Sequence, residues 1–262
     1  MKTRDQRFGA GAKKSRSYHY TKNSMLKRIL FIAITFIPFL GMLFYGNGMV
    51  SEWISKWAGK MMQTGLGIES TVQEMDFIPF FKLRYLSVEG SLPTRQHILI
   101  AGIACIVLML LVFFFGKGQS PLTFFGVISI IILLISTIYF YFWGDRFPYS
   151  LTRYASLYMT QQIVSWLAIG FILSMVLALY SKALLPAIIT YYGTLAYCFV
   201  LGSLRYLFYL IFLHHASSLY MATLFFTVGV FWDFLFVVCI FSMFSSRLSG
   251  RYKKRGDEIW QY

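Results

Sequence analysis

Residues 98–115 read ILIAGIACIVLMLLVFFF and residues 121–143 read PLTFFGVISIIILLISTIYFYFW, with only GKGQS between them. Neither stretch contains a charged residue, and a helix needs about 20 apolar residues to cross the hydrocarbon core of a bilayer. Pro121 suits the first turn of a helix, where its missing backbone N–H is not needed. The two stretches are therefore predicted to be a pair of transmembrane helices joined by a short polar turn.

Four further apolar runs flank this pair. They lie at residues 25–45, 160–181, 184–213 and 218–245, and basic segments stand at 1–24 and 246–262. Of the 262 residues 58% are hydrophobic and 13% are charged, a composition that excludes a disordered chain and a soluble enzyme. The predicted fold class is an all-α integral membrane protein with six transmembrane helices. Its first helix is separated by the segment 46–97 from a five-helix bundle at 98–245.

The basic charge is unevenly distributed among the segments that connect the runs. If both termini are cytoplasmic, sixteen Lys and Arg lie inside and seven outside, and subtracting the acidic residues leaves +13 inside and +1 outside. Lys and Arg collect on the cytoplasmic side of membrane proteins. The net charge of +14 is thus mostly an orientation signal. We expect a multi-pass protein of the inner or plasma membrane with cytoplasmic termini and an extracytoplasmic segment at 46–97.

The same charges indicate the partners of the chain. Each Lys or Arg near an anionic membrane surface contributes about 1 kcal/mol to binding, and the sequence contains no nucleic-acid-binding module. We therefore expect anionic lipids at the cytoplasmic face, protein partners in the membrane and no nucleic acid. His, Cys, Asp and Glu do not occur at metal-ligand spacing, so the sequence predicts neither a metal nor another cofactor.

The segment after the first run begins with a helical period over residues 49–62. One face carries Val50, Trp53, Ile54, Trp57, Ala58 and Met61, and the other carries Glu52, Ser55, Lys56, Lys60 and Gln63. Trp53 and Trp57 stand one turn apart, and indole rings prefer the membrane interface. The pattern predicts an amphipathic helix on the outer face, anchored by Trp53 and Trp57. A lid over a site is the alternative.

Residues 77–90 alternate between apolar and basic side chains. Phe81, Leu83 and Tyr85 are interleaved with Lys82 and Arg84. This strand-like period allows a small hairpin that is too short to be an independent domain. We expect it to pack on the outer ends of the helices or on a partner.

A second outer loop combines aromatic, charged and amide side chains. The candidate ligand or partner contacts are Asp145, Arg146, Arg153, Tyr154, Tyr158, Gln161 and Gln162. Rings together with Arg can bind sugar or phosphate head groups, although aromatic belts occur at most membrane boundaries. The two glutamines add polarity that a belt does not require, which favours ligand contact at this loop.

Arg205 and Asp233 are the formal charges that we place deep within the apolar runs, away from their ends. Helical side chains tilt toward the N-terminus, so Arg205 on an outward-running helix and Asp233 on an inward-running helix lean toward each other. Two interpretations stay open. The pair is either an interhelical ion pair that fixes packing, or part of a polar cavity for protons, ions or an anionic substrate.

Arg205 is followed nine residues later by His214, an arrangement that resembles exosortase-type membrane transpeptidases. That resemblance implies a cysteine nucleophile on the outer face upstream of the Arg, and the region 143–162 contains no cysteine. The chain is therefore not assigned to this family. GxSxG, HExxH and Gly-rich phosphate-loop motifs are also absent.

Three classes of function remain. We favour a noncatalytic subunit or accessory factor of an envelope-biogenesis or export complex that acts at the extracytoplasmic face. The outer segments offer interaction surface without a catalytic cluster, and the runs show no inverted repeat of the kind that carriers use. The alternatives are a membrane-embedded enzyme and a small transporter with a polar site around Arg205 and Asp233.

Overall fold

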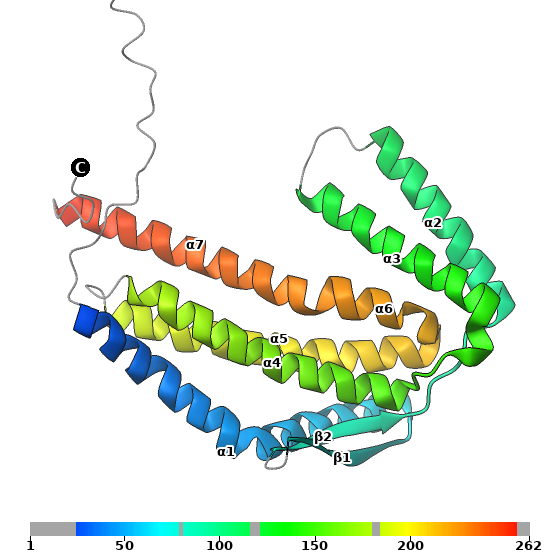
Figure 1. The fold of residues 1–262 in the computed structure, drawn as a ribbon, viewed down its shortest axis with the longest axis horizontal. Helices are drawn as coiled ribbons and strands as arrows, with labels where there is room; N and C mark the ends of the chain where they lie inside the picture. The colour runs from blue at the N-terminus through cyan, green and yellow to red at the C-terminus, as the bar shows by residue number, and fades with distance from the viewer. Residues whose placement is uncertain (1–24, 79–80, 116–120, 180–183, 256–262) are drawn as a thin grey trace, which may run out of the picture.

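The described part of the chain consists mainly of long helices (Figure 1). The computed structural model describes residues 25–78, 81–115, 121–179 and 184–255, so the basic segment 1–24 and the end of the basic segment 246–262 lie outside it. The long helices are α1 (Met25–Leu66), α2 (Arg95–Phe115), α3 (Pro121–Trp143), α4 (Leu151–Ala178), α5 (Leu184–Ala216) and α7 (Val230–Arg255). Six helices among the described residues are long and apolar enough to cross a membrane. The predicted fold class, an all-α integral membrane protein with six spanning helices, is confirmed.

Helices α4 and α5 form the centre of the bundle. Of their most apolar stretches, 44% and 39% are buried, against 17% and 11% for α2 and α3. Helix α4 contacts α5, α1 and α7, whereas α2 packs mainly on α3. In Figure 1 the α2–α3 pair stands to one side of the other helices. Polar side chains that must be shielded from lipid are therefore best placed on α4 and α5.

The first helix does not end at Tyr45. Helix α1 continues to Leu66 and so includes residues 49–62, which the sequence suggested as a separate interfacial helix. Gly46 and Gly48 each cost roughly 1 kcal/mol inside a helix, but neither takes the left-handed conformation that ends one. That conformation occurs at Gly67, with φ at 66°. Figure 1 shows α1 bending near its middle.

The second half of α1 turns its buried face toward the strands. This face consists of Ser51, Ile54, Ser55, Ala58 and Met62. Trp53 is 54% exposed, and its ring stacks on Trp57 and on Phe199 of α5, with centroids 6.4 and 5.9 Å apart. The role of the two tryptophans as an interfacial anchor stays a prediction.

The two strands form an antiparallel hairpin that is longer than the alternating segment. Strand β1 (Ser70–Ile78) pairs with β2 (Phe81–Val88), and the register is irregular between Asp76 and Ile78. Strand β2 contacts both α1 and α4. Leu83, Leu86 and Val88 of this strand are buried. The hairpin therefore belongs to the folded core through β2.

The sixth span begins irregularly. After α5, the two short turns η4 (Ser218–Tyr220) and α6 (Met221–Thr223) lead into the π-helical segment η5 (Leu224–Gly229) and then α7. A π-helical turn is rare and disturbs the regular i→i+4 hydrogen bonds of the backbone. Backbone carbonyls near Gly229 thereby become available to a side chain from another helix.

Candidate functional site

The structure brings Arg205 and Asp233 together in the centre of the bundle. The Arg205 side chain is 12% exposed, and each of its nitrogens donates to a neighbouring group. Nε donates to the Tyr158 hydroxyl (2.5 Å), Nη1 to the carbonyls of Val228 (3.0 Å) and Gly229 (2.8 Å), and Nη2 to Gln162 Oε1 (3.0 Å) and Asp233 Oδ2 (2.7 Å). A guanidinium has five N–H donors. All five therefore have an acceptor within this chain.

Two glycines allow the acceptors to approach Arg205. A Cβ at Gly202 would lie 2.4 Å from Nε2 of Gln162, which is itself buried. A Cβ at Gly229 would lie 3.1 Å from Nε2 of Gln161. Because both positions lack a side chain, α4 can come close to α5 and to η5 at the level of the guanidinium.

A cluster of tyrosines connects this centre to the hairpin. Tyr158 stacks on Tyr206 with centroids 6.0 Å apart and meets Tyr209 edge-on at 5.0 Å. Tyr206 also accepts a hydrogen bond from the Leu86 N–H of β2, at 2.9 Å. Arg205 is thus linked through Tyr158 and Tyr206 to a strand on the surface of the bundle. Tyr206 escaped the sequence reasoning, although it stands one helical turn after Gly202 on the buried face of α5.

Tyr206→Phe is expected to destabilise the protein by about 1–3 kcal/mol, since it leaves the Leu86 N–H buried without an acceptor. Tyr209→Phe is the matched control, because the Tyr209 hydroxyl is buried and has no hydrogen-bond partner among the described residues. Thermal unfolding in detergent measures the stability of each variant. The hydrogen-exchange rate of the Leu86 amide shows whether its N–H has lost an acceptor. Equal stability of both variants would show that the contact between Tyr206 and β2 contributes nothing.

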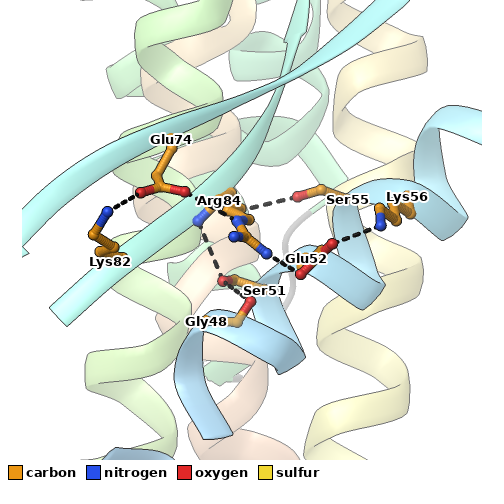
Figure 2. A network of polar contacts seen from close by, with 8 residues as sticks. All are labelled: Gly48, Ser51, Glu52, Ser55, Lys56, Glu74, Lys82 and Arg84. Carbon is orange, nitrogen blue, oxygen red and sulfur yellow. Dashed lines mark hydrogen bonds and ion pairs between the residues drawn. The ribbon is translucent and has the colours of Figure 1, made fainter.

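A polar network fixes the hairpin to the second half of α1 (Figure 2). The Arg84 N–H donates to Ser51 Oγ at 3.2 Å, and Ser55 Oγ donates to the Arg84 carbonyl at 3.1 Å. The Arg84 guanidinium pairs with Glu52 and Glu74. We call residues 49–66 together with β1 and β2 the hairpin platform. Its ion pairs and backbone contacts hold the strands in one orientation on the bundle.

Lys82 extends the same network on β2. Its Nζ lies 2.7 Å from Glu74 Oε1. This hydrogen bond raises the pKa of Lys82 above its ordinary value. Because Glu74 contacts both Lys82 and Arg84, it is neutralised by its own hairpin.

A cavity of about 550 Å³ lies where the end of β2 meets the start of α4 and the end of α5. Its lining includes Glu89, Ser91, Ser150, Thr152, Leu213 and Met221. Glu89 is the charged residue of this lining. None of the arginines that the sequence suggested as ligand contacts borders the cavity.

The candidate residues of the second outer loop do not form one site. Asp145 and Arg146 are exposed in the short turn η2 (Gly144–Arg146), and the Arg153 guanidinium lies 6.0 Å from the ring centre of Tyr149. By contrast, Tyr154, Tyr158 and Gln162 are buried inside the bundle, and Gln161 is half-buried. The structure therefore divides these residues between the surface and the Arg205 centre.

Arg205 and His214 do not come together. Nine residues along an α-helix correspond to about 13 Å of rise and to opposite faces. His214 Nδ1 lies 2.7 Å from the Glu89 carbonyl oxygen and donates to it, which ties the end of α5 to the hairpin. In the described ranges, no group of three or more His, Cys, Asp or Glu side chains could hold a metal ion.

The chemistry of the Arg205 centre is limited by the way its donors are used. Asp233 is 3% exposed and bonds to Arg205, so a substrate anion could reach the guanidinium only by displacing an acceptor from this chain. The hydrogen bonds of Arg205 link α5 to α4, η5 and α7. No protein-family model, curated protein or solved structure matches the chain.

Proposed function

We propose that this multi-pass membrane protein is a noncatalytic subunit or accessory factor of an envelope-biogenesis or export complex. The observation that carries this proposal is the complete use of the Arg205 donors by groups of the chain itself. A transporter or enzyme that recognises an anion needs donors that are free before the substrate binds. A buried pair with all its donors bonded is better suited to fixing how the helices pack.

The uneven distribution of Lys and Arg supports an orientation with the termini in the cytoplasm. In Figure 1 the start of α1 and the end of α7 lie at one end of the bundle, and the hairpin lies toward the other. With that orientation the hairpin platform stands at the extracytoplasmic face. Its exposed polar side chains offer a surface to a protein partner, and the helices on which β2 packs support it.

Purification of the tagged full-length chain from native membranes in a mild detergent tests this function. We expect a further polypeptide to elute with it in a fixed ratio, as measured by native mass spectrometry. The double variant R205A/D233A, compared at equal abundance, should keep that ratio because the pair is structural. Elution of the wild-type chain alone would contradict the subunit function. An intact complex that loses its cellular activity only in the double variant would instead assign a chemical role to the pair.

A further inference from the structure

The two outer edges of the hairpin differ in whether their backbone groups already have hydrogen-bond partners. On the outer edge of β2, the Arg84 backbone bonds to Ser51 and Ser55, and the Leu86 N–H bonds to Tyr206. Thr152 Oγ1 donates to the Val88 carbonyl at 3.4 Å. Side chains of α1, α4 and α5 therefore occupy the backbone groups that a further strand would need. The edge of β2 is closed.

The register then determines which backbone groups of β1 point outward. In an antiparallel pair, residues directly opposite each other either exchange hydrogen bonds or both point away. Arg84 is opposite Glu74, Leu86 is opposite Val72, and Val88 is opposite Ser70. Because these three residues of β2 point away from β1, their partners on β1 point away from β2. Ser70, Val72 and Glu74 thus present N–H and C=O groups on the outer edge of β1.

The outer edge of β1 is open. Among the residues that the structure describes, no hydrogen bond to the backbone of Val72 or Glu74 comes from outside the hairpin, and Val72 is 41% exposed. Figure 1 shows β1 on the side of β2 that faces away from α4 and α5. Proteins usually protect such an edge with Lys, Pro or a bulge. The range 70–76 contains neither residue, and the irregularity begins only after Asp76.

Charge indicates what could pair with this edge. Glu69 and Asp76 are exposed near the two ends of β1, and residues 61–78 contain no Lys or Arg. Glu74 pairs with Lys82 and Arg84, and Asp76 stands opposite Lys82 in the register. The three carboxylates of residues 69–76 still outnumber the two basic residues of β2, and this excess negative charge attracts a basic strand. A second copy of β1 would add its own carboxylates, and like charges on paired strands are destabilising. The occupant is therefore a basic segment of another protein.

We propose that the outer edge of β1, from Ser70 to Asp76, binds an extended basic segment of a partner protein by strand addition. Main-chain hydrogen bonds from an added strand are an established mode of peptide recognition. The inference rests on the proposed function, because it names the surface through which a noncatalytic subunit contacts its assembly. Because the edge of β2 is closed, an added strand can pair with the hairpin only at β1.

A labelled nine-residue peptide in which Lys alternates with Val provides the probe. We expect it to bind the full chain in nanodiscs, as measured by fluorescence anisotropy. N-methylation of one alternate set of its amides should weaken binding at least tenfold, and methylation of the other set should not, because only one edge of the peptide faces β1. A peptide with Glu in place of Lys should bind at least tenfold more weakly. Equal binding by both methylated forms, or by the Glu and Lys peptides, would overturn the proposal.

Val72→Pro tests the same edge from the side of the protein. It removes an outward N–H and no hydrogen bond between β1 and β2, whereas the control Val72→Thr keeps that N–H. We expect at least tenfold weaker peptide binding by V72P than by V72T. In the wild-type chain, the Val72 and Glu74 amides should gain protection from hydrogen exchange on peptide binding, and the Gln73 amide should not change. Unchanged exchange at all three amides would contradict strand addition even if V72P were to misfold.

Purification from native membranes separates this inference from the proposed function. A partner that elutes equally with V72P and V72T would exclude the β1 edge and leave the subunit function standing. A wild-type chain that elutes alone would contradict the function itself. A partner retained by V72T and lost by V72P is the result that we expect.

Discussion

Arg205→Ala is expected to lower the free energy of unfolding by about 3–5 kcal/mol, the range for removing one partner of a buried ion pair. The change strands the Asp233 carboxylate, which is 3% exposed and whose hydrogen-bond donor is Arg205. It also removes the donor to the carbonyls of Val228 and Gly229. Arg205→Lys should be nearly as damaging, because one ammonium cannot reach acceptors on three elements.

Asp233→Ala should lower the stability of the protein less than Arg205→Ala does. Asp233→Ala leaves Arg205 bonded to Tyr158, Gln162 and two carbonyls, whereas Arg205→Ala leaves Asp233 without its donor. The double variant R205A/D233A should be more stable than R205A, since it strands no charge. Exchanging the two residues should not restore stability, because a carboxylate at position 205 would face the carbonyl oxygens.

Thermal unfolding of the purified variants in detergent, together with their abundance in membranes, measures this cycle. We expect the order of stability to be wild type, then D233A, then the double variant, with R205A last. Effects of the two single changes that simply add in the double variant would show that the pair has no interaction energy.

Gly170→Ala is expected to cost about 1–3 kcal/mol, the usual range for overpacking a core. A Cβ at this position of α4 would lie 2.4 Å from Cε1 and 2.8 Å from Cδ1 of Phe39. The ring cannot simply turn away, because it is buried and meets Tyr191 edge-on with centroids 6.3 Å apart. The contact between α1 and α4 must therefore open.

Gly193→Ala is the matched control for this prediction. Gly193 lies in the neighbouring helix α5, and a Cβ there would meet nothing within 4 Å. Because Ala is a better helix former than Gly by roughly 1 kcal/mol, this variant should be neutral or slightly more stable. Both variants are compared by thermal unfolding in the same detergent. An equal loss of stability in the two would show that helix packing at Gly170 is not the cause.

The sequence was sufficient for the membrane class and for the number of spans. Stretches such as 98–115 and 121–143 contain no charge, and a chain in lipid must satisfy its backbone hydrogen bonds internally, which makes such stretches helical. Arg205 and Asp233 also stand out in the sequence, because a charge deep within an apolar run is visible without any structure. These features depend on composition and local period alone.

The acceptors around Arg205 could not be derived in the same way. Tyr158 and Gln162 were candidates for a ligand site on the outer loop, and the carbonyls of Val228 and Gly229 carry no sequence signal at all. They meet the guanidinium because α4 and η5 approach α5 at Gly202 and Gly229. Which helices meet, and at what level, is set by packing between segments that are distant in the chain.

The hairpin platform shows most clearly which features the sequence determined and which only the tertiary structure decided. An apolar period over residues 49–62 determined a helix, but it placed Ser55 on the polar side, whereas the structure buries Ser51 and Ser55 against β2. Their burial is stable because they bond to the Arg84 backbone, which is a partner that no local pattern can name. Hydrophobic period therefore determined which segments are helices. Only the tertiary structure decided which polar groups find partners inside, and that the edge of β2 is closed while the edge of β1 stays open.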